Sequence, residues 1–131
     1  MLGRVNINES NIIKVFHDGK FYINPISNSW LLENKELISP NHSIMQFDFN
    51  DGKEKVLFID YYTVSEDGEL IVSSDAGYAN GFQKNLYGSG TVKRTICTKV
   101  KNKSTITGAT LNTLNRRTFH IKSIWLEKVG S

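Results

Sequence analysis

Aspartate-glycine pairs divide the first half of this chain into short segments of β type. The chain places HDGK between IIKVF and FYINP, NDGK between IMQFDF and KVLFIDYYTV, and SEDGE between that run and LIVSS. Asp-Gly is a strong hairpin signal, because glycine adopts the positive φ that a tight turn requires. These signals predict antiparallel neighbours joined by tight connections. The best helical window, residues 31–37, is short and is followed by Pro40, so no helix is predicted.

Hydrophobic alternation indicates how several of these segments face the core. Met45, Phe47 and Phe49 share one face, as in a half-buried strand. The run from Val56 to Tyr62 is apolar almost throughout and predicts a central strand covered on both sides. A later run predicts an outer strand, in which one face carries Val92, Arg94, Ile96, Thr98 and Val100 and the other carries Lys93, Thr95, Cys97 and Lys99. Many short strands without helices predict an all-β antiparallel sandwich or barrel.

The final segment changes its pattern part-way. Phe119 and Ile121 alternate with polar residues, and then Ile124, Trp125 and Leu126 follow in a row. A β-bulge between residues 122 and 124 would change the facing and bring Trp125 against a second surface. Trp125 is therefore either a core residue or part of a ligand platform or subunit contact.

Two longer stretches are predicted to be loops. The first reads SSDAGYANGFQKNLYGSGT and the second NKSTITGATLNTLNRRT. Sugar binding needs flat aromatic faces together with amides or carboxylates for the hydroxyl groups, and the first stretch has both. Its candidate residues are Tyr78, Asn80, Phe82, Asn85 and Tyr87, with Asp75 and Gln83 beside them. An ordinary loop that covers the end of a sandwich is the alternative, as is a site on a sheet face.

Size and charge set further limits. The 131 residues predict one domain over residues 1–131, either complete or part of a larger multidomain protein. The single cysteine, Cys97, excludes an internal disulfide. Neither a signal peptide nor a membrane span is visible. The balance of 16 basic against 13 acidic residues is a weak basic excess. We interpret these basic residues, in KRTICTKVKNK and at Arg116 and Arg117, as part of a solvated outer sheet face. No nucleic-acid partner is therefore expected.

Catalytic signatures are lacking in the sequence. No GxSxG, HExxH or phosphate-binding glycine loop occurs in a suitable context, and we predict neither enzyme activity nor a metal or cofactor site. Asp60 is the one carboxylate that interrupts an apolar run. A partner is required there, and Arg94 is the candidate. A small enzyme using Asp60 is the remaining catalytic alternative.

The second half of the chain resembles jelly-roll carbohydrate-binding modules, including related domains of phage tail and baseplate proteins and of glycoside hydrolases. The resemblance covers roughly Lys55 to Val129 and depends on the order GELIVSS, a glycine-rich loop, GSGTVKRTICTKV and RRTFHIKSIWLEKV. Arg94 matches the arginine of the strand entry, where Val92 replaces a tryptophan. The apolar positions of the terminal strand are matched by Phe119, Ile121, Ile124 and Leu126. Lys122 replaces an aspartate that helps to hold a structural calcium ion in many of these modules. Calcium takes oxygen ligands, so a lysine cannot bind it.

The resemblance implies an antiparallel β-sandwich of jelly-roll, galactose-binding-like type. It implies a non-catalytic carbohydrate-binding or host-recognition module, in a phage tail or baseplate or appended to a cell-wall-acting enzyme. The candidate ligand-binding residues are Tyr78, Asn80, Phe82, Asn85, Tyr87, Asp60, Arg94 and Trp125. Expected partners are a cell-surface glycan or polysaccharide and other virion subunits, with a homotrimer as one assembly. The expected location is a virion or the extracellular space. The alternative is a purely structural or oligomerisation domain.

Overall fold

The structure is a computed structural model that describes residues 12–22, 24–39, 43–49, 51–63, 68–87, 90–110 and 119–129. All regular structure in these residues is β-strand. The strands are β1 (Ile12–His17), β2 (Lys20–Phe21), β3 (Ser27–Asn28), β4 (Leu31–Glu33), β5 (Glu36–Ser39), β6 (Ser43–Asp48), β7 (Lys55–Thr63), β8 (Gly68–Ser74), β9 (Phe82–Tyr87), β10 (Lys93–Val100), β11 (Lys103–Thr110) and β12 (Phe119–Lys128). None of the described residues forms a helix long and apolar enough to span a membrane.

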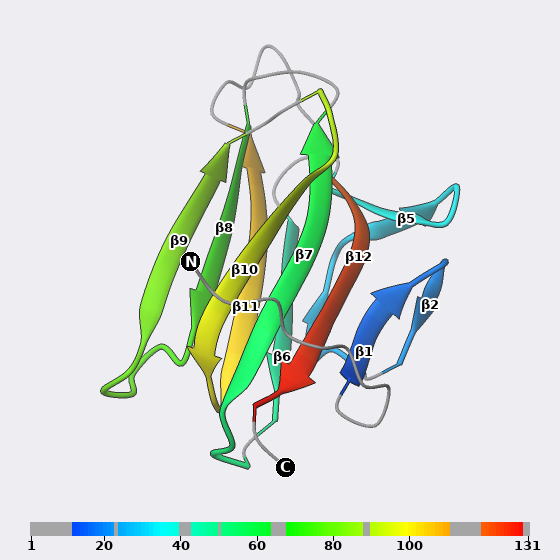
Figure 1. Cartoon of the computed structure of the whole chain (residues 1–131). Helices are drawn as coiled ribbons and strands as arrows, with labels where there is room; N and C mark the ends of the chain where they lie inside the picture. The colour runs from blue at the N-terminus through cyan, green and yellow to red at the C-terminus, as the bar shows by residue number, and fades with distance from the viewer. Residues whose placement is uncertain are drawn as a thin grey trace.

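The strands form two antiparallel sheets that pack face to face (Figure 1). The seven-stranded sheet has the order β10-β7-β12-β1-β2, with β5 paired to β12 and β4 paired to β5. The five-stranded sheet has the order β3-β6-β11-β8-β9. Apolar side chains from the facing sides fill the space between the sheets; among them are Met45, Phe47, Leu57, Ile59, Leu70, Val72, Ile106, Ile121, Ile124 and Leu126. The predicted all-β sandwich is confirmed.

The terminal strand β12 lies in the middle of the seven-stranded sheet, between β7 and β1. Its register with β7 shifts between Ile121 and Ser123, so the predicted bulge is present and begins one residue earlier than expected. Because of this shift, Ile124 pairs with Ile59 towards the core, and Trp125 pairs with Phe58 on the outer face. The four matched apolar positions of β12 are fully buried.

Two of the three predicted hairpins are wrong. HDGK does join a hairpin: β1 pairs with β2, and Asp18 and Gly19 have φ of 51° and 77°. NDGK instead connects β6 of one sheet to β7 of the other. The strands on either side of SEDGE, β7 and β8, also belong to different sheets, although residues 64–67 lie outside the described part. A turn motif sets the local backbone conformation, and it does not decide whether the flanking strands pair or change sheet.

The two predicted loops contain strands. Residues 82–87 form β9, the edge of the five-stranded sheet, and residues 103–110 form β11, a central strand of that sheet. β11 has few apolar residues because Gly108 and Ser104 occupy inner positions beside Ile106. Arg116 and Arg117 lie outside the described residues.

The facing predicted for β10 is also wrong, although its position as an outer strand is confirmed. Thr95 and Cys97 are buried, whereas Ile96 is 38% exposed on the outer face. The register shifts between Cys97 and Val100, and Lys99 in that interval has φ of 61°. This irregularity returns Val100 to the core.

The first residue of β7 is a buried lysine that binds to two neighbouring connections. Lys55 is fully buried, and its Nζ donates to Asp51 Oδ1 at 2.5 Å, to the Lys53 carbonyl at 2.8 Å and to the Lys101 carbonyl at 3.0 Å. The ammonium also lies 5.0 Å from the centre of the Phe49 ring. Three oxygen acceptors, two from the β6–β7 connection and one from the β10–β11 connection, thus surround one positive charge, which compensates for its burial.

Candidate functional site

The eight candidate ligand-binding residues fall on two opposite faces of the sandwich. Asp60, Arg94 and Trp125 lie on the outer face of the seven-stranded sheet. The other five belong to the β8–β9 hairpin of the five-stranded sheet. They do not form one site.

The hairpin residues are themselves divided by their facing. Phe82 is half-buried against the core. Tyr78 is 49% exposed in the turn that precedes β9, whereas Tyr87 is 61% exposed at the other end of the strand. At about 3.3 Å per residue, five residues of β9 separate Phe82 from Tyr87 by roughly 17 Å. Tyr78 and Tyr87 therefore do not contact one ring of a ligand together.

Asn80 stabilises the hairpin turn. Its Nδ2 donates to Asp75 Oδ2 at 2.8 Å and to the Lys99 carbonyl at 3.1 Å. Asp75 is fully buried, so the Asn80 amide helps to compensate a buried charge. The hydrogen bonds give Asn80 a structural role in this turn.

Polar side chains form a row across the outer face of the five-stranded sheet. The register places Gln46 of β6 beside Thr105 of β11, Thr105 beside Ser73 of β8, and Ser73 beside Gln83 of β9. Three strand spacings of about 4.8 Å make the row roughly 14 Å long. We call these four residues the amide–hydroxyl row. All four are uncharged and at least partly exposed.

Hydrogen bonds orient the ends of the amide–hydroxyl row. At one end, Thr105 Oγ1 donates to Gln46 Oε1 at 3.4 Å and Gln46 Nε2 donates to Asp48 Oδ1 at 3.2 Å. At the other, Gln83 Nε2 donates to Asn85 Oδ1 at 3.0 Å, and Asn85 Nδ2 donates to Glu69 Oε1. These amides are held before any ligand arrives, which reduces the ordering cost of binding.

Tyr87 provides an aromatic surface on the same outer face, four residues or roughly 13 Å along β9 from Gln83 at the end of the row. It lies directly across from Glu69 on the same outer face, two residues from Asn85. Its high exposure leaves the ring accessible for stacking on the apolar side of a sugar. Sequence reasoning identified Asn85 and Tyr87 but missed Gln46, Glu69, Ser73 and Thr105, because only the register between four strands brings them together.

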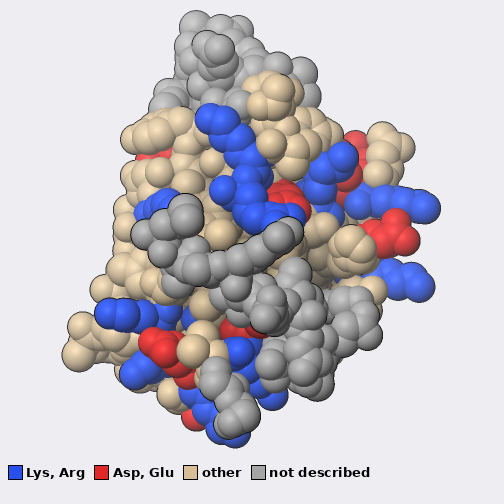
Figure 2. Space-filling view, in the orientation of Figure 1, with Lys and Arg blue, Asp and Glu red and all other residues tan. Residues whose placement is uncertain are grey.

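The opposite face of the sandwich is rich in charge. Lys and Arg side chains gather across the middle of the seven-stranded sheet, beside acidic groups (Figure 2). The predicted partnership of Asp60 with Arg94 is confirmed, with Arg94 Nε 2.6 Å from Oδ1 and Nη2 3.0 Å from Oδ2. This fork raises the pKa of Arg94. The Arg94 guanidinium also lies 5.0 Å from the centre of the Trp125 ring, which stacks on Phe58.

An acidic residue organises the neighbouring part of this face. Glu36 Oε1 accepts a hydrogen bond from the Tyr62 hydroxyl at 2.5 Å and lies 3.3 Å from His120 Nδ1. The Tyr62 and His120 rings stack with centres 4.6 Å apart. Burial and the adjacent Glu36 carboxylate raise the pKa of Tyr62 to about 12. Beside this cluster is an open pocket of about 490 Å³ whose lining includes Glu36, Asp60 and Lys122.

The charged groups do not form a metal centre. The described residues contain no group of three or more His, Cys, Asp or Glu side chains that could hold a metal ion. Lys122, which replaces the calcium-binding aspartate of the resembled modules, lies 4.0 Å from Glu36 Oε2.

No protein-family model matches the sequence, and no curated protein matches it. Solved structures with the same fold include family 29 carbohydrate-binding modules. A lysine-to-alanine mutant of the module CBM29-2, complexed with cellulohexaose, has a TM-score of 0.60 and 12% identity over 92% of each chain. An aspartate-to-alanine mutant of CBM29-2, complexed with mannohexaose, has a TM-score of 0.62 and 14% identity over 92% of each chain. The module CBM29_1 from Piromyces equi has a TM-score of 0.57 and 13% identity over 88% of this chain and 89% of its own.

At this identity the comparison concerns the fold. The chain has the jelly-roll sandwich fold of family 29 carbohydrate-binding modules over most of its length, so the predicted fold class is confirmed. The ligands named for those structures belong to those proteins.

Proposed function

We propose that this chain is a non-catalytic carbohydrate-binding module whose ligand lies across the outer face of the five-stranded sheet. The observation that carries this proposal is the amide–hydroxyl row beside Tyr87. A sugar hydroxyl both donates and accepts hydrogen bonds, and so do side-chain amides and hydroxyls. The row is long enough to contact more than one sugar ring.

The binding mechanism is stacking combined with hydroxyl hydrogen bonding on a shallow surface. Tyr87 stacks on the apolar side of one sugar ring, and Asn85 and Glu69 beside it bond to the hydroxyl groups of that ring. Gln83, Ser73, Thr105 and Gln46 contact the next rings along the row. A shallow single site gives an affinity of about millimolar to micromolar, or roughly −4 to −8 kcal/mol. Repeated copies in one particle raise the avidity.

The uncharged row favours neutral polysaccharides. Two of the structures with this fold were solved with cellulohexaose and with mannohexaose, and these two neutral oligosaccharides are therefore the first ligands to test. Asp60, Arg94 and Trp125 stay candidates for a separate site on the opposite face.

The test is calorimetric titration of the chain with cellulohexaose and mannohexaose, with Tyr87→Ala and Tyr78→Ala alongside. Both tyrosines are exposed, so neither substitution is expected to unfold the protein. Loss of one stacking ring is expected to weaken binding about tenfold in Tyr87→Ala, with no change in Tyr78→Ala. Equal losses in both variants, or binding that neither affects, would move the site away from this face.

We also propose, from the resemblance of the sequence, that the module serves host recognition in a phage tail or baseplate, or is appended to a cell-wall-acting enzyme. Cell-surface glycan and other tail subunits are then its partners. Light scattering of the purified chain tests the assembly part: a concentration-independent homotrimer supports a particle subunit, whereas a monomer argues against it. A trimer that binds none of the glycans would favour the purely structural alternative.

A further inference from the structure

The open pocket on the seven-stranded sheet is built by the β12 bulge and two hairpin turns. Lys122 and Ser123, at the bulge, line it together with Asp60 of β7. The turns contribute Asp18 between β1 and β2 and Lys35 between β4 and β5, with φ of 51° and 61°. Positive φ is uncommon for residues other than glycine, and here both residues lie in the tight turns that form two sides of the pocket.

The carboxylates of this pocket already have partners. Both oxygens of Asp60 accept from the Arg94 guanidinium, at 2.6 and 3.0 Å. Glu36 Oε1 accepts from Tyr62 at 2.5 Å. These groups still have lone pairs for further donors, because an ionised carboxylate has about four acceptor positions.

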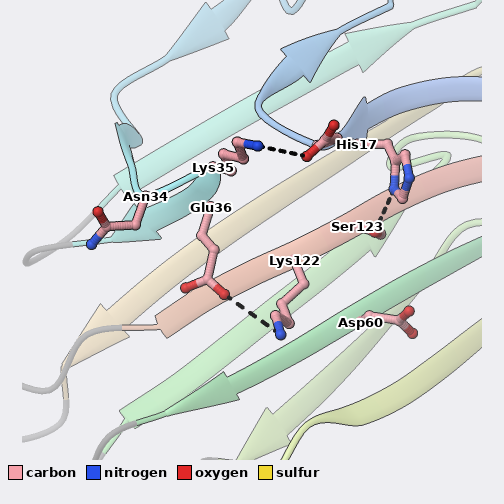
Figure 3. A pocket seen from close by; sticks show the side chains of 8 residues that line it. His17, Asn34, Lys35, Glu36, Asp60, Lys122 and Ser123 are labelled. Carbon is pink, nitrogen blue, oxygen red and sulfur yellow. Dashed lines mark hydrogen bonds and ion pairs between the residues drawn. The ribbon is translucent and has the colours of Figure 1, made fainter.

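The two lysine ammonium groups are bound less closely. Lys122 Nζ lies 4.0 Å from Glu36 Oε2, and Lys35 Nζ lies 3.7 Å from Asp18 Oδ1. Both distances exceed a normal hydrogen bond. The Lys122 side chain is 51% exposed. Figure 3 shows Lys122 between Glu36 and Asp60 in the pocket. Its ammonium therefore has donors to offer to a ligand.

We propose that this pocket binds a monoanionic sugar acid of the hexuronic type. The ligand carboxylate pairs with the Lys122 ammonium, which lies between Glu36 and Asp60. The ligand ring hydroxyls donate to Glu36 and Asp60, which line the same pocket, and Lys35 on the other side of the pocket donates to a ring oxygen. A neutral sugar leaves Lys122 without an added anionic partner.

The charge count favours one negative charge over two. The pocket is lined by the carboxylates of Asp18, Glu36 and Asp60, which are paired with Lys35, Lys122 and Arg94 respectively, so its acidic and basic groups balance. A dianionic phosphate is repelled by three carboxylates more strongly than a carboxylate ligand is. The pocket lies on the opposite face from the amide–hydroxyl row, so this proposal does not depend on the neutral-glycan site, and each can fail separately.

The test is an amide chemical-shift titration of the ¹⁵N-labelled chain at low ionic strength with glucuronate, glucose, acetate and inorganic phosphate. Glucuronate is expected to shift the amides of Asp60, Lys122 and Ser123 and those of the two turns, and to bind more tightly than the other three ligands. Added salt is expected to weaken binding, because the contact is charged and partly exposed. Glucose binding as tight as glucuronate, or tighter phosphate binding, would overturn the assignment.

Variants complete the test. Lys122→Gln removes the central ammonium and is expected to weaken glucuronate binding about tenfold, and Lys35→Gln is expected to weaken it less. Lys84→Gln is the matched control, because Lys84 is exposed on β9 of the other sheet. The amide spectrum of each variant, recorded without ligand and compared with that of the wild type, verifies that the variant is folded. Unchanged affinity in both Lys122→Gln and Lys35→Gln would contradict the proposal.

Discussion

Asp75 offers the sharpest test of how the β8–β9 turn is held. Its buried carboxylate accepts hydrogen bonds from the backbone N–H groups of Lys101 at 2.7 Å, Asn102 at 2.5 Å and Lys103 at 3.0 Å, and from Asn80 Nδ2 at 2.8 Å. Burial by itself raises the pKa of Asp75, but these four donors outweigh burial, so its pKa lies below the ordinary value. One side chain therefore links the β8–β9 turn to the β10–β11 connection.

The substitution Asp75→Asn removes the charge and keeps the shape. Asparagine tolerates the positive φ of 52° at this position as well as aspartate does. However, the asparagine NH₂ group takes the place of one carboxylate oxygen. It must therefore face at least one backbone N–H group that donated a hydrogen bond to that oxygen. A hydrogen bond to a charged group contributes about 1.5–3 kcal/mol, and a buried donor without an acceptor costs about 1–3 kcal/mol. We expect Asp75→Asn to lower the free energy of unfolding by about 2–4 kcal/mol at pH 7.

The pH dependence follows from the lowered pKa of Asp75. A carboxyl whose pKa is lower in the folded state stabilises the protein above its unfolded pKa of about 3.9, and this contribution is lost as pH falls through the folded pKa. The difference between wild type and Asp75→Asn is therefore expected to shrink below about pH 4.

Urea unfolding followed by tryptophan fluorescence at neutral and acidic pH measures both effects. Asp18→Asn is the matched control, because Asp18 also has positive φ but its side chain is 65% exposed; its change is expected to stay within about 0.5 kcal/mol. The reasoning is refuted if Asp75→Asn unfolds at the wild-type urea concentration at pH 7, or if its deficit is the same at pH 3 and pH 7.

Two further substitutions test the packing. Lys55→Met leaves three oxygen acceptors without their shared ammonium and is expected to cost about 2–4 kcal/mol in urea unfolding; a more stable variant would contradict this. Gly108→Ala places a Cβ against the side chain of Ser39 across the core, and the resulting overpacking is expected to cost about 1–3 kcal/mol. Wild-type thermal stability of Gly108→Ala would show that β5 moves aside at no cost.

Most of the seven-stranded sheet could be predicted from the sequence, because its strands carry strong apolar patterns. Val56 to Tyr62 is apolar on both faces and became the central strand β7. In β12 the consecutive apolar residues Ile124, Trp125 and Leu126 predicted the bulge. Side chains of a regular strand alternate between its two faces, and only an extra residue changes which positions point to the core.

Two strands of the five-stranded sheet, β9 and β11, were harder to predict because they are poor in apolar residues. In β11, Gly108 and Ser104 replace larger core side chains, so the strand has the composition of a loop. In β9, only Leu86 is buried. In the seven-stranded sheet β10 is the exception, because nothing in its sequence indicates the register shift beyond Cys97.

The candidate site illustrates a limit of reasoning from one segment at a time. Tyr87 and Asn85 were identified by residue type within one stretch of the chain. Gln46, Ser73 and Thr105 lie on three separate strands, and none has a distinctive local pattern. Their alignment depends on the pairing register, which is set by packing of the inner face.

The most direct test of the carbohydrate-binding proposal is an amide chemical-shift titration of the ¹⁵N-labelled chain with cellulohexaose and with mannohexaose. The proposal predicts that shifts concentrate on the outer-face residues of β6, β11, β8 and β9, with Asn85 and Tyr87 among the largest. Shifts confined to β7 and β12, or none at millimolar ligand, would contradict it.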